Sequence, residues 1–214
     1  LEKKVMASAQ RSRTSYMDAA SSIAKLGLNA RDAFGSMDEV IAFQELINKQ
    51  FIIGGASVQE QQAAMIQLTQ AMASGVLRGE ELNSVFEQAP GIIQSIADYL
   101  DVSIGEIRAM AAEGQLTADV VKNAMFAAAD DIETKFSNMP KTWGQIWIGM
   151  KNKALSIFNP ILNKVNQVAN SEKFTQVTNG VINGLAGIAS VATVVLDLLI
   201  GGAALVVDNW SWLA

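Results

Sequence analysis

Hydrophobic side chains recur at helical spacing along most of the chain, and helix-start signals stand directly before them. Three serines are each followed by a glutamate three residues later, which is the spacing of a capping box: Ser36 and Glu39, Ser57 and Glu60, and Ser103 and Glu106. Thr117 is a further candidate cap, and apolar residues continue at helical spacing from it to Phe136. Because no segment alternates between apolar and polar residues with a period of two, we expect no β-strand.

Glycines stand where these apolar patterns end. Gly54, Gly55, Gly75 and Gly114 each follow the last residue of a periodic stretch, where a left-handed residue commonly ends a helix. Residues 1–27 differ, because they form a polar pattern with only a thin apolar stripe, which predicts one polar helix. These signals together predict a compact bundle of short helices.

A longer amphipathic helix is expected after residues 137–140. Its apolar residues share one broad face: Trp143, Ile146, Trp147, Met150, Ala154, Ile157 and Phe158. Pro160 should kink this helix or restart it. Residues 161–183 are polar, and residues 184–207 are almost wholly apolar. The predicted fold class is therefore all-α: a compact bundle of short helices, then a longer amphipathic helix, then an apolar helical segment.

The net charge of −5 is unevenly distributed along the chain. Residues 1–31 carry +4, residues 32–133 carry −12, residues 134–183 carry +5 and residues 184–214 carry −2. An acidic middle is a poor surface for nucleic acid, so we expect no specific nucleic-acid binding. The basic stretch suits an acidic partner or anionic lipid, although its lysines are equally consistent with a merely solvated surface.

Composition and charge divide the chain into four regions. They are a polar helical lead-in (1–31), an acidic helical module (32–136), a basic Trp-containing helical linker region (137–183) and an apolar region (184–214). The chain begins at Leu1 rather than at methionine and ends after an apolar stretch, so we expect a piece of a longer protein.

The absence of cysteine and histidine excludes several kinds of chemistry. Disulfide scaffolds, thiol nucleophiles, histidine-dependent triads and His-Glu zinc motifs all need residues that this chain does not contain. The adjacent carboxylates Glu80-Glu81 and Asp130-Asp131 point about 100° apart on a helix, so they do not form an acid/base pair. We therefore expect no catalytic residues, no cofactor and no metal, and we do not expect an enzyme.

Two strings carry a more specific signal, and both come from the acidic module. Residues 75–91 read GVLRGEELNSVFEQAPG, and residues 103–121 read SIGEIRAMAAEGQLTADVV. This region resembles the N-terminal conserved region of phage tail tape-measure proteins. The matching residues are Gly75, Arg78, Glu81, Leu82, Asn83, Ala89, Pro90, Gly91, Gly105, Glu106, Glu113, Gly114, Leu116 and Thr117. The family usually has glycine where this chain has Asp101, a residue that also tolerates a left-handed turn.

The resemblance implies a structural role in a phage or prophage tail. Such proteins template the length of the tail tube from inside it and later help DNA to pass through the host envelope. The implied partners are tail-tube proteins, tail-tip proteins and tail assembly chaperones, together with further copies of the chain and the host membrane. The implied location is the virion, inside the tail tube, with the host cell membrane reached on infection. An alternative is a membrane-active or pore-forming helical protein unrelated to tails.

The motif residues have structural explanations as well as functional ones. The Ala89-Pro90-Gly91 corner should reverse the chain between two short helices so that Phe86, Ile92 and Ile93 can meet. Arg78 should bond the carbonyls that end the preceding helix, or pair with Glu80 or Glu81. We prefer these structural explanations to partner recognition.

Two further segments suggest contact with a membrane or a partner. Trp143 and Trp147 lie four residues apart beside several lysines, which suits either an interfacial helix or a helix docked onto the acidic module. Residues 184–207 are long enough to span a bilayer, although Asp197 lies near their centre, and they are also consistent with a buried core helix. Trp210 and Trp212 lie just beyond them as candidate membrane contacts.

Overall fold

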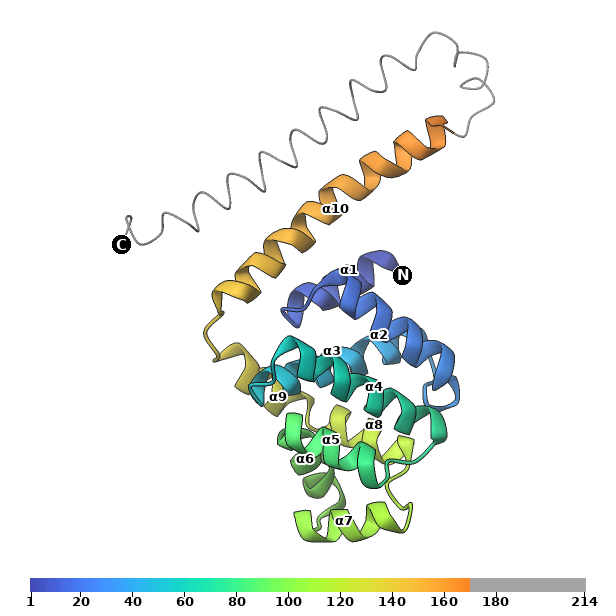
Figure 1. The fold of residues 1–214 in the computed structure, drawn as a ribbon, viewed down its shortest axis with the longest axis vertical. Helices are drawn as coiled ribbons and strands as arrows, with labels where there is room; N and C mark the ends of the chain where they lie inside the picture. The colour runs from blue at the N-terminus through green and yellow to red at the C-terminus, as the bar shows by residue number, and fades with distance from the viewer. Residues whose placement is uncertain (170–214) are drawn as a thin grey trace. The chain divides into compact units, whose positions relative to one another are not determined.

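The computed structural model describes residues 1–169, which form ten α-helices and one short 3-10 helix without a β-strand (Figure 1). In chain order the elements are α1 (Glu2–Arg11), α2 (Tyr16–Asn29), η1 (Arg31–Ala33), α3 (Met37–Ile53), α4 (Val58–Ser74), α5 (Gly79–Gln88), α6 (Pro90–Leu100), α7 (Ile104–Ala112), α8 (Ala118–Ala127), α9 (Ala129–Ser137) and α10 (Trp143–Ala169). The all-α prediction is confirmed for these residues. The predicted apolar segment, 184–207, lies outside them.

Helix starts follow the predicted capping pattern in most places. The hydroxyls of Ser57 and Ser103 accept from the third amide of α4 and α7, and the glutamates there accept from the cap amides, so both capping boxes are complete. These hydrogen bonds from Ser57 and Ser103 lower the pKa of Glu60 and of Glu106.

The predicted box at the start of α3 is only half correct. Ser36 does cap the amide of Glu39, but the Glu39 carboxylate accepts from Gly35 N–H at 2.7 Å instead of from Ser36 N–H. All three serines have an extended backbone, but φ is −158° at Ser36 and −65° and −73° at Ser57 and Ser103, which complete their boxes. The carboxylate therefore reaches the amide one residue earlier.

Left-handed residues follow the helices at three of the four glycines expected there, whereas Gly54 is right-handed, with φ −69°. Gly55, Gly75 and Gly114 have φ values of +80°, +82° and +72°, and Asp101 adopts the same region at +56° after α6. The expectation that Asp101 accepts a left-handed turn is therefore confirmed. A fifth residue, Arg13, has φ +53° in the corner between α1 and α2.

Three helix boundaries differ from the sequence prediction. The single helix expected over residues 1–27 is two helices, because the chain turns at Arg13. The helix expected from Thr117 to Phe136 breaks at Ala128, whose ψ is 3°. At Pro160, the expected restart is wrong: α10 continues through it, since a proline removes one backbone hydrogen bond and a long helix tolerates that loss.

The core is built around α3, which packs against α1, α2, α6, α8 and α9. Its side chains Phe43, Ile47 and Phe51 are fully buried. Because α1 packs on α3, and α2 packs on both α3 and α4, the two helices belong to the first compact unit, which runs from Leu1 to Ile157. The division of the chain at residues 31 and 136 stays a prediction.

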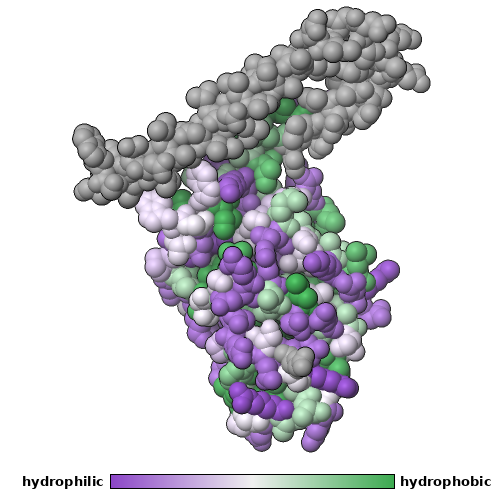
Figure 2. Space-filling model, in the orientation of Figure 1, coloured by the Kyte–Doolittle hydropathy of each residue, from purple (hydrophilic) through white to green (hydrophobic). Residues whose placement is uncertain are grey.

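The surface of the helical body agrees with the polar pattern of its sequence. On the face shown in Figure 2, hydrophilic side chains are spread over the body and strongly hydrophobic ones appear in small patches. Surface helices with one apolar stripe produce such a surface when the stripes meet in the interior.

Candidate functional site

The two halves of the family-like motif meet in space. The chain after α4 runs antiparallel to the chain before α8, with an isolated bridge between Val76 and Thr117. Leu77 N–H donates to the Leu116 carbonyl at 2.7 Å, and Ala118 N–H donates to the Gly75 carbonyl at 2.8 Å. Two segments about 40 residues apart in the sequence are thereby joined into one unit.

Arg78 lies on the same joint as this bridge. Its guanidinium packs against Gly114, where an added Cβ would stand 3.0 Å from Nη2. Among the side chains that the structure describes, Arg78 forms no hydrogen bond or ion pair, so the predicted bond to the helix-ending carbonyls and the predicted pairing with Glu81 are both wrong. The Glu80 side chain lies outside those described. Position 114 requires glycine for two reasons. Its φ is positive, and the Arg78 guanidinium occupies the space that a side chain would fill.

The remaining residues of the motif divide into buried, capping and exposed positions. Leu82 and Leu116 belong to the core. Thr117 accepts from Val120 N–H at 3.3 Å, as Ser103 does from the amide of Glu106. The side chains of Asn83 and Glu113, and the backbone at Gly105, are exposed, and Glu81 is half-buried.

The Ala89-Pro90-Gly91 corner joins α5 directly to α6. Pro90 is the first residue of α6, where its missing N–H costs nothing, and Ala89 is fully buried. The buried amide of Gln50 from α3 packs directly against the position where Gly91 would carry a Cβ, and it donates to the Gly91 carbonyl at 3.3 Å. The corner is therefore a packing contact between α3 and α6.

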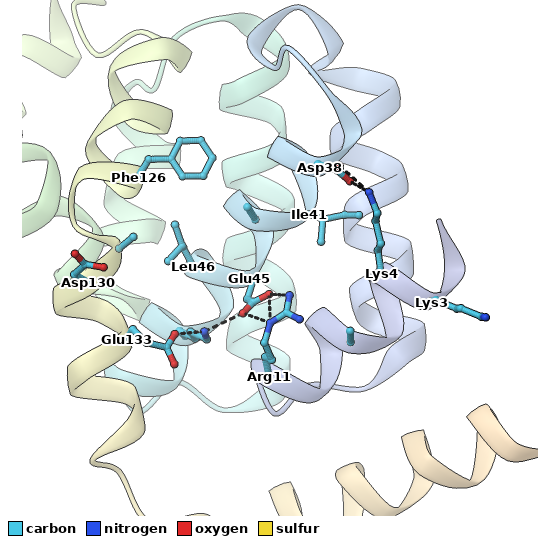
Figure 3. A pocket seen from close by; sticks show the side chains of 14 residues that line it. Lys3, Lys4, Arg11, Asp38, Ile41, Glu45, Leu46, Phe126, Asp130 and Glu133 are labelled. Atoms are coloured by element: carbon cyan, nitrogen blue, oxygen red, sulfur yellow. Dashed lines mark hydrogen bonds and ion pairs between the residues drawn. The ribbon is translucent and has the colours of Figure 1, made fainter.

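A second cluster lies in an open groove of about 710 Å³ that α1, α3, α8 and α9 line (Figure 3). Glu45 of α3 accepts from Arg11 Nη2 at 2.7 Å and from Lys49 Nζ at 2.9 Å, and Lys49 also pairs with Glu133 of α9. Lys49 is only 3% exposed and Glu45 only 7%. The four charges thus form a chain of ion pairs across three helices.

The buried carboxylate of this chain is held in its ionised form. Burial by itself raises the pKa of Glu45, but hydrogen bonds from Arg11 and Lys49 outweigh it, and the pKa lies below its ordinary value. The same bond to Glu45 raises the pKa of Arg11. Such a network holds helices in register, and a lowered carboxylate pKa does not suit a general acid.

Comparison with known protein families decides the identity of the chain. A family model described as tape measure protein matches residues 1–164. The chain belongs to the tape measure protein family. No curated protein and no solved structure matches it. The matched residues include the motif joint, the ion-pair chain and the first part of α10.

Family membership implies a role in determining phage tail length, with phage tail components as partners and the virion as location. Tape measure proteins are in general structural and not catalytic. In the part of the chain that the structure describes, no group of three acidic side chains is placed to hold a metal ion. The membership argues against the alternative of a membrane-active protein unrelated to tails.

The predicted contact residues of this tape measure chain fall partly on α10. Trp143 and Trp147 are 72% and 43% exposed, so the expectation that this aromatic face docks onto the acidic module is wrong. Asp197, Trp210 and Trp212 lie outside the described residues. Within residues 1–169, none of the helices has the length and hydropathy that a membrane span requires.

Sequence reasoning missed the residues that hold the tape measure fold together across distance. The pair of Glu45 and Lys49 had a local signal, since the two residues are four positions apart on one helix. Arg11 and Asn152 had none, because their partners lie far away in the sequence.

Replacing Gly75 with alanine should cost about 1–2 kcal/mol of unfolding free energy, because alanine is strained at a left-handed residue. No heavy atom lies within 4 Å of the added Cβ, so the loss isolates the backbone. Gly79→Ala is the matched control, because its surroundings are equally open but it lies in the first turn of α5. Urea unfolding followed by circular dichroism measures both. Equal effects at the two positions would contradict the explanation.

Proposed function

We propose that residues 1–157 are a folded module of a tape measure protein and are not themselves the length-setting ruler. The observation that supports this is the packing of α1 to α9 into one body, in which α3 contacts five of the other helices. An extended helix advances about 1.5 Å per residue, whereas helices packed side by side do not add their lengths along one axis. The family match includes the whole module.

In this proposal the module contributes to starting tail assembly, and a helical portion elsewhere in the parent protein templates the tube. Tail-tube subunits polymerise around that portion, and tail-tip proteins and assembly chaperones contact the protein. The finished virion holds it inside the tail tube, and on infection it assists DNA passage through the host envelope. The strongly acidic stretch 32–133 offers a surface for basic partners.

Tail length in mutant phage tests the proposal. Removing 28 residues in register from a helical ruler should shorten tails by about 42 Å, at about 1.5 Å per residue. A charged residue in the core of the module, Ile93→Asp, should instead reduce the number of tails and leave their length unchanged. The exposed substitution Tyr99→Asp on the same helix is the control. Electron microscopy of the virions measures both quantities.

Tails that shorten in proportion to residues deleted within 1–157 would contradict the proposal, because the module itself would then be part of the segment that sets tail length. Normal numbers of tails with Ile93→Asp, in a protein whose module is shown by circular dichroism to be unfolded, would exclude a role of the module in starting assembly.

A further inference from the structure

The first part of α10 carries an apolar face that is open to solvent. Trp147, Met150, Ala154 and Ile157 recur at intervals of three and four residues and are all exposed. Trp143 extends the same face at its N-terminal end and is also exposed. A face with this spacing lies on one side of a helix.

The opposite side of this first part of α10 is fixed to the folded body. The Asn152 amide donates to the Thr14 carbonyl at 2.7 Å and accepts from Tyr16 N–H at 2.9 Å, and the residue is 2% exposed. Gln145 Oε1 lies 3.5 Å from Arg13 Nη1 on the same side. At about 100° per residue, Asn152 lies roughly half a turn from the centre of the apolar face. The corner between α1 and α2 therefore binds the polar side of α10, and the apolar face points away from that corner.

Positive charge lines both edges of this face. Lys151 and Lys153 flank it on its two sides, and Lys151 Nζ lies 5.8 Å from the centre of the Trp147 ring. The sequence contains no aspartate or glutamate from residue 134 to residue 171. An apolar face with tryptophan, bordered by lysines and without carboxylates, is typical of helices that lie in the interface of an anionic membrane.

We propose that residues 143–157 of α10 bind the surface of an anionic lipid bilayer and lie in its headgroup region without crossing it. Tryptophan suits this depth because its ring is apolar and its N–H is polar. Pairing with α10 of a second copy is less favourable, because both copies would bring lysines and no carboxylate to the edges of the contact. The inference goes beyond the role in tail assembly, and its test does not depend on tail length.

The test uses the full chain with Trp210→Phe and Trp212→Phe, so that the two remaining tryptophans report on α10. Vesicles of equal parts phosphatidylglycerol and phosphatidylcholine are compared with vesicles of phosphatidylcholine alone. We expect co-flotation and a blue-shifted emission only with the anionic vesicles, and weaker binding when NaCl is raised from 50 to 500 mM. Lipids brominated near the headgroup should quench the emission more than lipids brominated deep in the chain.

Charge reversal on α10 is the decisive variant. Lys151→Glu with Lys153→Glu should weaken binding to the anionic vesicles at least tenfold. Lys3→Glu with Lys25→Glu makes the same change in net charge at exposed lysines of α1 and α2, and it should weaken binding much less. Both variants should fold, because none of these four side chains is buried. Circular dichroism checks this.

Three results would overturn the proposal. The first is equal weakening by the two double variants, which would make binding a matter of net charge alone. The second is vesicle binding without a change in the emission of Trp143 and Trp147, which would assign it to another part of the chain. The third is a blue shift that follows protein concentration without lipid, with oligomers in sedimentation, since a second copy would then cover the face.

Discussion

Replacing Ile96 with alanine is expected to lower the free energy of unfolding by about 2–5 kcal/mol. Ile96 lies on α6, is 0% exposed and belongs to the core that α6 forms with α5 and α8. The loss combines the transfer of the removed carbon atoms with the cavity that they leave. Because α6 is held by neighbours on several sides, the cavity cannot close by a simple shift of the helix. Urea unfolding of the full chain measures the loss.

Two companion variants and one control sharpen this expectation. Leu82→Ala should cost nearly as much, since Leu82 is also buried. Phe86→Ala should cost less, because Phe86 is only partly buried and one face of its ring lies 4.7 Å from the guanidinium of Arg108. Tyr99→Ala, at an exposed position of α6, should change stability little. Losses below about 0.5 kcal/mol for Ile96 and Leu82 would contradict the core assignment.

Removing the buried ammonium of the ion-pair chain should have the second large effect. Lys49→Ala should destabilise the protein by about 3 kcal/mol, because it leaves the carboxylate of Glu45 buried with a single partner. This loss of stability is at the lower end of the range for breaking a buried ion pair, since Arg11 still donates to Glu45. Thermal and urea unfolding measure it.

An exposed ion pair on the same groove provides the control. Lys4 and Asp38 approach to 2.7 Å, but both side chains are more than half exposed, so Lys4→Ala should cost no more than about 1 kcal/mol. The double variant Glu45→Met with Lys49→Met should recover much of the loss, because it removes both buried charges. If Lys49→Ala and Lys4→Ala cost the same, burial does not determine the strength of these pairs.

The pH dependence of stability has a definite sign at Glu45. Its pKa in the folded protein is lower than the value of 4.5 that it has when unfolded. The stabilisation by Arg11 and Lys49 is therefore complete above about pH 4.5 and is lost as the pH falls through the lower, folded pKa. The variant Glu45→Gln should show a shallower loss of stability over the same acid range.

Local hydrogen bonds made much of the helical pattern predictable from the sequence. Ser57 and Ser103 meet their glutamates within one turn, and Thr117 meets Val120 in the same way. The left-handed residues at Gly75 and Gly114 are predictable because glycine meets no steric cost there. Each of these signals involves residues that are neighbours along the chain, so no knowledge of the fold is needed to read it.

Two helix breaks were missed for different reasons. The break at Arg13 had a local signal that was overlooked, because Ser15 caps α2 by accepting from Asp18 N–H at 3.1 Å. The break at Ala128 had neither a capping side chain nor the glycine or proline that marks a break. Tertiary packing overrides helix propensity at such positions because the core gains more from redirecting the chain than a further helical turn would contribute.

The functional surfaces depend most on tertiary structure. Family membership could be inferred from the motif itself, but its role as a joint appears only when Leu77 and Leu116 pair and Arg78 reaches Gly114. The apolar face of α10 could be inferred from its spacing. Its exposure was decided by Asn152, whose partners lie more than 130 residues away in the sequence. A one-dimensional pattern states which side chains share a face, and only the folded chain determines what that face meets.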